Sequence, residues 1–172
     1  MEVVKGPDDG RDQALCQLVE RHQTALLRMC YLYLHDQALA EDAVQETFLK
    51  AYKAMHTFRG ECSEKTWLMR IAINTCRDMR RSGWFRYVDR HVTPELLPEA
   101  SAGFTEKDEE VTLAIMRLPG RCRETVMLRF YEQMSVAEIA QALNVTTATV
   151  SSQLHRAKKK LRSALERGSM DE

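Results

Sequence analysis

The sequence is poor in the residues that interrupt helices and in those that favour sheets. Its 172 residues include only 7 glycines and 4 prolines, and aromatic residues make up 7%. Leucine, alanine, glutamate, lysine, arginine and glutamine, which all favour helices, are abundant instead. We therefore expect an all-α protein, long enough for one medium-sized domain or two small ones.

Long apolar runs are also missing. No stretch approaches the roughly 20 residues that a membrane-spanning helix needs. The residues from Met1 to Gly10 lack the apolar core of a signal peptide. We expect a cytoplasmic protein without direct membrane insertion.

The sequence has no pattern typical of a metal site or a catalytic site. A zinc site that uses His22 or His56 finds no support in the ligand spacing. A glycine-rich phosphate loop, a nucleophile elbow and a convincing acid/base pair are all missing, so we predict no catalytic residue, no metal and no cofactor. The cysteines form no C-x-x-C pair, and in a cytoplasmic chain they are interpreted as reduced, mostly buried small residues. They are Cys16, Cys30, Cys62, Cys76 and Cys122.

A net charge is missing as well, because Lys+Arg and Asp+Glu both number 25. Proteins that bind nucleic acids are often basic overall, so this balance argues weakly against DNA binding. The distribution of the charges along the chain must therefore carry the argument.

Apolar residues at helical spacing predict two small helical domains. The first covers residues 11–83 and contains three helices, and the second covers residues 106–168. Residues 84–105 contain Pro94, Pro98 and Gly103 and read as a flexible acidic linker, since a connection of this length is unusual inside one compact domain. The apolar stripe of the third helix is predicted to be Trp67, Leu68, Ile71, Ala72, Thr75 and Met79.

The second domain carries the clearest motif, a helix-turn-helix. Ser135 and Glu138 have the spacing of a capping box at the start of a short helix. Asn144 follows that helix and tolerates the left-handed conformation that a tight turn needs. Thr146 can then cap a second helix that starts at Thr147.

The second helix of this motif has two different faces. Val150, Leu154, Ala157, Leu161 and Leu165 are spaced to face the core. The opposite face begins with small polar residues, which can approach base edges, and continues with cations, which can pair with phosphates. A basic helix alone is more often a solvated surface, but the short capped helix, the tight turn and the small residues together favour a DNA-recognition helix. This opposite face comprises Thr147, Ala148, Ser151, Ser152, His155, Lys158, Lys159 and Arg162.

The first domain has two clusters of charge. One is acidic, lies on the second helix and fits either a solvated face or a protein-docking surface; it comprises Asp36, Glu41, Asp42, Gln45 and Glu46. The other is basic with interleaved aromatics, which suits single-stranded DNA because cations follow phosphates and aromatic rings stack on unpaired bases. It runs from Phe58 and Arg59 through Lys65, Trp67, Arg70, Asn74, Arg77, Arg80 and Arg81 to Trp84 and Phe85. For Trp67, packing in the core is an equally good interpretation.

These residues resemble the extracytoplasmic-function (ECF) sigma factors of bacterial RNA polymerase. The segment from Asp42 to Phe48 resembles the family's polymerase-docking signature, and the segments 58–61, 66–68 and 70–74 resemble its strand-melting segment. Leu118-Pro119, Arg123-Glu124, the segment 128–130 and the helix-turn-helix resemble its −35-binding domain. The resemblance extends from about Asp12 to Leu165, with the motifs in the family's order.

The resemblance implies a role for each segment. Asp42, Gln45, Glu46 and Phe48 would contact the clamp helices of the largest polymerase subunit. The −10 element would be met, as a single strand with a flipped base, by Phe58, Arg59, Gly60, Glu61, Trp67, Arg70, Asn74 and Arg77. The −35 duplex would be met by Thr147, Ser151, Ser152, His155, Arg156 and Lys159.

The resemblance further implies partners for the whole protein. The linker would run toward the polymerase active-site cleft, and the second domain would rest on the flap of the second-largest subunit. Promoter DNA and an anti-sigma factor complete the expected partners. The zero net charge would then reflect acidic surfaces that face polymerase and basic surfaces that face DNA.

Two positions depart from the family pattern. Ser151 and Gln153 are neutral where the family is often basic, which predicts fewer phosphate contacts and a shallower salt dependence. Cys62 stands in the base-capturing loop, where a small polar residue is usual; a tolerated small residue is the ordinary interpretation and a redox sensor the alternative.

The main alternative function is a stand-alone helix-turn-helix regulator with an N-terminal sensor. Such a protein needs neither the signature from Asp42 to Phe48 nor the aromatic-basic helix. The sequence lacks the motifs typical of an enzyme, and an anti-sigma or adaptor protein would not need the basic recognition helix.

Overall fold

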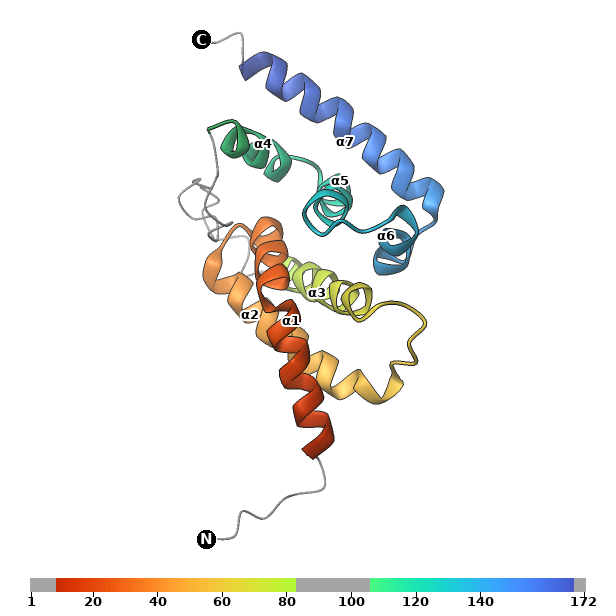
Figure 1. Cartoon of the computed structure of the whole chain (residues 1–172). Helices are drawn as coiled ribbons and strands as arrows, with labels where there is room; N and C mark the ends of the chain where they lie inside the picture. The colour runs from red at the N-terminus through yellow and green to blue at the C-terminus, as the bar shows by residue number, and fades with distance from the viewer. Residues whose placement is uncertain (1–8, 83–105, 169–172) are drawn as a thin grey trace.

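The computed structural model describes residues 9–82 and 106–168, and these parts are helical without any strand (Figure 1). The all-α prediction is therefore confirmed. The predicted linker, residues 84–105, lies outside the described residues. No helix in the described part of the chain is long and apolar enough to cross a membrane.

The first domain consists of three helices and one short 3-10 turn. They are α1 (Asp9–Leu34), α2 (Gln37–Ala54), η1 (Met55–Thr57) and α3 (Glu64–Arg81). Asp36 starts α2 by accepting a hydrogen bond from the Leu39 amide at 2.8 Å, and Ser63 starts α3 by accepting one from the Thr66 amide at 3.1 Å. Both caps supply acceptors for amides that have no partner inside the helix.

The buried side of α3 is wider than the sequence predicts. Leu68, Ala72 and Thr75 are buried as expected, but Trp67, Ile71 and Met79 are only partly buried. In addition, α3 buries a second set of residues, Met69, Ile73 and Cys76. The reason is that α3 packs against α1 and α2 and also against α6 of the second domain. A single apolar stripe is expected for a helix that packs against one neighbouring layer, whereas α3 packs against two layers.

The second domain is built from four helices and a π-helical turn. They are α4 (Glu106–Met116), α5 (Gly120–Val126), η4 (Met127–Tyr131), α6 (Val136–Leu143) and α7 (Thr147–Gly168). Val126, Met127, Leu128 and Ile139 fill the centre of this domain. Phe130 belongs to the apolar pattern of its segment but is 66% exposed, because the π turn directs it away from the core.

The helix-turn-helix forms as predicted. Glu138 donates its amide to Ser135 Oγ at 3.2 Å, while its carboxylate accepts from the Ser135 amide at 2.7 Å. These hydrogen bonds lower the pKa of Glu138 below its ordinary value. Asn144 has φ 53° and ψ 51°, the left-handed conformation, and Thr146 Oγ1 accepts from the Thr149 amide at 3.1 Å.

Replacing Ser135 with alanine should destabilise the second domain by about 1 kcal/mol, because the Glu138 amide loses its acceptor while the bond from the residue 135 amide to the Glu138 carboxylate is kept. A thermal melt of the full chain, followed by circular dichroism, measures this loss. Ser163→Ala makes the same chemical change inside α7, away from any cap, and should not lower stability. Equal melting curves for both variants would contradict the role given to the cap.

The two domains contact each other. α3 lies against α6, and the end of α1 lies near α5 (Figure 1). Three of the five cysteines are buried, and Cys30 of α1 meets Cys76 of α3 in the interior. A hydrogen bond with Cys30 and burial raise the pKa of the Cys76 thiol, which keeps this thiol protonated.

Candidate nucleic-acid interface

Helix α7 separates its core residues from its polar residues. Val150 and Ala157 are fully buried, whereas Leu154, Leu161 and Leu165 are partly buried. All six side chains predicted to meet duplex DNA are exposed. They are Thr147, Ser151, Ser152, His155, Arg156 and Lys159. The N-terminal half of this face therefore offers hydroxyl groups and the later half offers charge.

An open groove of about 720 Å³ adjoins this face, between the start of α5 and α7. Its lining includes Arg121, Arg156 and Lys160, together with the hydroxyl groups of Thr149 and Ser152. Three cations beside two hydroxyl groups suit a phosphate. Sequence reasoning missed Arg121 and Lys160, because Arg121 comes from a different helix and Lys160 lies beside the predicted stripe.

Gln153 is not part of this face. Its side chain is 8% exposed, and its Oε1 accepts a hydrogen bond from Thr125 Oγ1 of α5 at 2.9 Å. Of the two neutral positions noted above, only Ser151 therefore bears on phosphate contacts. Gln153 instead fixes α7 against α5, because a buried amide needs a partner.

The loop that precedes α3 presents small and charged residues. Gly60 has φ 73°, and Arg59, Gly60 and Glu61 are exposed. The rings of Phe58 and Trp67 stack with centroids 4.8 Å apart and planes inclined by 26°. Trp67 also packs against the hydrophobic core, so its ring connects Phe58 of the loop to the interior of the domain.

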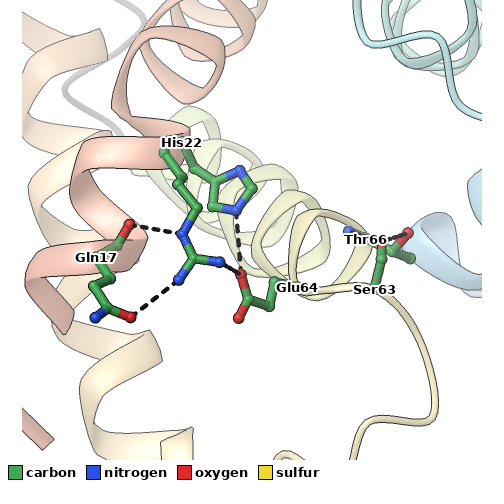
Figure 2. Close-up of polar contacts among 6 residues, drawn as sticks. Gln17, His22, Ser63, Glu64 and Thr66 are labelled. Atoms are coloured by element: carbon green, nitrogen blue, oxygen red, sulfur yellow. Dashed lines mark hydrogen bonds and ion pairs between the residues drawn. The ribbon is translucent and has the colours of Figure 1, made fainter. Parts of the chain in front are cut away.

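The base of this loop is tied to α1 (Figure 2). Glu64 Oε2 accepts a hydrogen bond from Arg21 Nη1 at 2.9 Å, and His22 Nε2 lies 3.6 Å from the same oxygen. Gln17 accepts from Arg21 one turn earlier in α1. His22 thus has a carboxylate neighbour, and the described residues contain no group of three His, Cys, Asp or Glu side chains that could hold a metal ion.

Three cations of α3 contact the second domain. Arg77 donates from Nε and Nη2 to the two carboxylate oxygens of Glu124 at 3.0 and 2.7 Å. Arg70 donates from Nε and Nη2 to the Gln141 carbonyl at 3.0 and 2.6 Å. Lys65 Nζ donates to the Glu132 carbonyl at 2.7 Å and lies 3.1 Å from Glu132 Oε2. Asn74, the other predicted strand contact on α3, is exposed and has no such partner described.

Glu124 is almost completely enclosed, with a side-chain exposure of 3%. Tyr33 Oη donates to Glu124 Oε1 at 2.7 Å, so the carboxylate has partners from both α1 and α3. The hydrogen bond with Glu124 raises the pKa of Arg77, and burial followed by the charge of Glu124 raises the pKa of Tyr33 to about 12. Tyr33 therefore remains a neutral donor at physiological pH.

This environment predicts a late ionisation of Tyr33. Because its folded pKa lies above the ordinary value of 10.0, the stability that it contributes is complete below pH 10 and is lost as the pH rises toward 12. The difference in tyrosinate absorbance between the wild type and Tyr33→Phe, followed against pH, isolates this group. A transition centred near pH 10 would contradict the arrangement around Glu124.

The acidic cluster on α2 faces outward in part. Asp42, Gln45 and Glu46 are exposed, whereas Phe48 is 8% exposed and packs in the core. Leu49 is 55% exposed and, seven residues after Asp42, lies on the same face. Sequence reasoning missed Leu49, because the apolar pattern alone does not distinguish it from the buried Phe48.

The comparisons with known proteins agree in both domains. Residues 18–86 match the model for sigma-70 region 2, and residues 108–161 match that for sigma-70 region 4. The chain is 31% identical to the RNA polymerase sigma-H factor of Pseudomonas aeruginosa, covering 96% of this chain and 93% of that protein. It is 30% identical to the ECF RNA polymerase sigma factor SigX of Bacillus subtilis, covering 87% and 82%.

A solved structure extends the likeness to the fold. CnrH, determined in complex with the cytosolic domain of CnrY, superposes with a TM-score of 0.71 and 26% identity, covering 91% of this chain and 90% of that one. Both sigma-70 regions occur in the expected order, with the exposed polar face of α7 in the second and the cationic helix α3 in the first. The chain belongs to the ECF sigma factors, which direct RNA polymerase to promoters.

Proposed function

We propose that this sigma factor uses one surface to bind polymerase and two others to recognise the promoter. The acidic face of α2 docks on core polymerase, the loop 58–61 with α3 reads the −10 single strand, and α7 reads the −35 duplex. The observation that carries this proposal is the exposed face of α7, where the hydroxyl groups precede the cations along one helix.

The −35 assignment follows from the chemistry of α7. Thr147, Ser151 and Ser152 are small enough to let the helix enter the major groove, and their hydroxyl groups can donate to or accept from base edges. Arg156 and Lys159 follow one to two turns later, where the groove wall presents phosphates. Arg121 and Lys160, which line the adjoining groove, extend the phosphate contact.

The −10 assignment rests on the loop before α3. The exposed stretch from Arg59 to Glu61 gives a flipped base access to backbone groups, and the stacked pair of Phe58 and Trp67 supports the loop. Arg70, Asn74 and Arg77 recur at steps of four and three along α3, so they follow one line on which a strand can lie.

The docking assignment rests on the outward face of α2. Asp42, Gln45 and Glu46 supply the charge and hydrogen-bonding groups, and the exposed Leu49, one turn after Gln45, adds an apolar contact to the same face. Phe48 supports this face from inside the domain, so we assign it a packing role in docking. The proposed counterpart is the clamp-helix region of the largest polymerase subunit.

The remaining partners are proposed on the family and on its relatives. CnrH was solved in complex with another protein, the cytosolic domain of CnrY, and we propose that an anti-sigma factor binds this chain. The second domain would also rest on the polymerase flap, and the linker would run toward the active-site cleft. The protein would act in the cytoplasm, where polymerase acts, and would leave the chemistry of RNA synthesis to polymerase.

A stand-alone regulator is not favoured as an alternative, because residues 18–86 match sigma-70 region 2 rather than a sensor domain. The deciding experiment is transcription in vitro with bacterial core polymerase, with and without this protein, on a fragmented genomic library from its host. New start sites that share two spaced upstream elements are expected. Tight duplex binding by the protein alone, without new transcripts, would overturn the proposal.

A further inference from the structure

A second pocket lies between α3, the start of α5 and the turn that follows α6 (Figure 1). Its volume of about 530 Å³ falls within the usual size of a small-molecule site, roughly 300–1,000 Å³. We propose that this interdomain pocket binds a diphosphate group, supplied either by a nucleoside diphosphate or by inorganic pyrophosphate. Its charged lining comprises Arg77, Arg81, Arg121 and Glu124.

The charges on the wall of the interdomain pocket favour an anion. Three guanidinium groups and one carboxylate line it, so the lining is positive overall. The carboxylate of Glu124 already has its partners, because Arg77 donates to both of its oxygens at 3.0 and 2.7 Å and Tyr33 Oη donates at 2.7 Å. The positive charge available to a ligand therefore belongs to Arg81 and Arg121, whose side chains are both exposed.

These two arginines approach the pocket from different domains. Arg81 ends α3, and Arg121 lies in the first turn of α5. The ion pair of Arg81 with Asp78, at 3.9 Å, is exposed and holds the guanidinium only weakly. A guanidinium binds phosphate oxygens in a two-pronged geometry, so two linked phosphates can occupy both arginines, whereas a single phosphate fills only part of a pocket of this size.

The uncharged lining can hold a group attached to the diphosphate. Leu143 and Val145 form an apolar wall against which a base or a ribose can pack. Asn144 and Gln153 add amide groups, which can hydrogen-bond to phosphate oxygens or to a base. A few polar groups beside an apolar wall are typical of small-molecule sites.

The interdomain pocket shares residues with both proposed DNA surfaces. Arg77 belongs to the proposed −10 surface, and Arg121 also lines the groove beside α7. A diphosphate bound here therefore competes with promoter phosphates for the same cations. This consequence rests on the proposed function, whereas the binding of a diphosphate is a property of the free chain.

Isothermal titration calorimetry of the full chain with pyrophosphate, at constant ionic strength, tests the pocket directly. The wild type should show saturable binding at one site. Arg81→Gln with Arg121→Gln should weaken this binding by about 100-fold, about tenfold for each lost charged contact. The matched control, Lys158→Gln with Arg162→Gln, removes two exposed cations of α7 outside the pocket and should bind like the wild type. All four side chains are exposed, so both variants should melt like the wild type.

The outcomes separate a built site from a basic surface. If the wild type shows no saturable binding, or if both variants lose affinity equally, the anion follows the general positive charge and the proposal is wrong. ADP and adenosine, titrated in the same way, identify the source of the diphosphate. Tighter binding of ADP than of pyrophosphate assigns the pocket to a nucleotide, and otherwise the inorganic anion is its ligand. Adenosine that binds as tightly as ADP would overturn the assignment to a diphosphate.

Displacement of a fluorescent single-stranded oligothymidylate tests the competition with DNA. Pyrophosphate at about ten times its own dissociation constant should weaken binding of the oligonucleotide about tenfold. Sulfate at the same ionic strength should have a much smaller effect, and equal displacement by sulfate would overturn the competition. Because the calorimetry uses neither DNA nor polymerase, a failure of the interdomain pocket and a failure of promoter-directed transcription are read separately.

Discussion

Replacing Arg156 and Lys159 with alanine is expected to abolish most promoter binding at physiological salt while leaving the protein folded. Both side chains are exposed on α7, so their removal creates no cavity. Each charged hydrogen bond to DNA contributes roughly 1.5 kcal/mol or more, and about 1.4 kcal/mol corresponds to a factor of ten in affinity. Two lost contacts should therefore weaken binding by about 100-fold.

The salt dependence separates phosphate contacts from any other loss. Each released counterion contributes roughly 0.9 to the slope of log K against log salt concentration, so the double variant should flatten the slope by roughly 1.8. The measurement is open-complex formation by polymerase with this sigma factor on a mapped promoter, over a range of salt concentrations. Arg117→Ala with Arg167→Ala removes the same charge from other exposed positions and should leave the slope unchanged. A weaker complex with an unaltered slope would show that Arg156 and Lys159 do not face phosphates.

The recognition motif could be predicted from sequence because its determinants are local. Ser135 and Glu138 satisfy each other within one turn, and Asn144 adopts the left-handed conformation that its short polar side chain tolerates. The six residues predicted to face DNA are all exposed, since helical periodicity on α7 follows from one buried stripe. Nothing distant in the chain is needed for this part of the argument.

The residues that escaped prediction are those whose environment comes from another helix. Gln153 looks like a surface position in sequence, yet it is buried because Thr125 lies opposite it on α5. Met69 and Ile73 are buried because α3 has neighbours on two sides. Phe48 and Leu49 differ by only one position, but the 100° step between them places one in the core and the other in solvent.

The contacts between the domains were also beyond sequence reasoning. Arg77 and Glu124 are 47 positions apart, and Arg70 and Gln141 are 71 apart. Periodicity marks α3 as cationic but does not show which anion lies nearest in the folded chain. The sequence therefore indicates a cationic helix, and only the fold shows that residues of the second domain are the partners of its cations.

Replacing Asp42 and Glu46 with alanine is expected to lower the affinity for core polymerase by tenfold or more. Both carboxylates are exposed one turn apart on α2, and the only ion pair found for them within the described residues joins Glu46 to Lys50 at 3.8 Å. Such an exposed pair contributes little to stability, so the variant should melt like the wild type. Close charge pairs across an interface contribute more, roughly 1.5 kcal/mol or above.

The neighbouring residues make this prediction specific to docking. Leu49→Ala should weaken polymerase binding without lowering the melting temperature, because its side chain is exposed. Phe48→Ala should instead destabilise the first domain by about 3 kcal/mol or more, because it leaves a cavity in the core. Glu20→Ala with Glu166→Ala removes two exposed charges elsewhere and should leave polymerase affinity unchanged.

The affinities can be measured by fluorescence anisotropy of the labelled sigma factor titrated with core polymerase. If Asp42→Ala with Glu46→Ala binds as tightly as the wild type, the docking surface lies elsewhere and the acidic face of α2 is a solvated surface. If it binds weakly and melts like the wild type, the loss belongs to docking and not to folding, because Asp42 and Glu46 are exposed on α2 and their removal leaves the core intact.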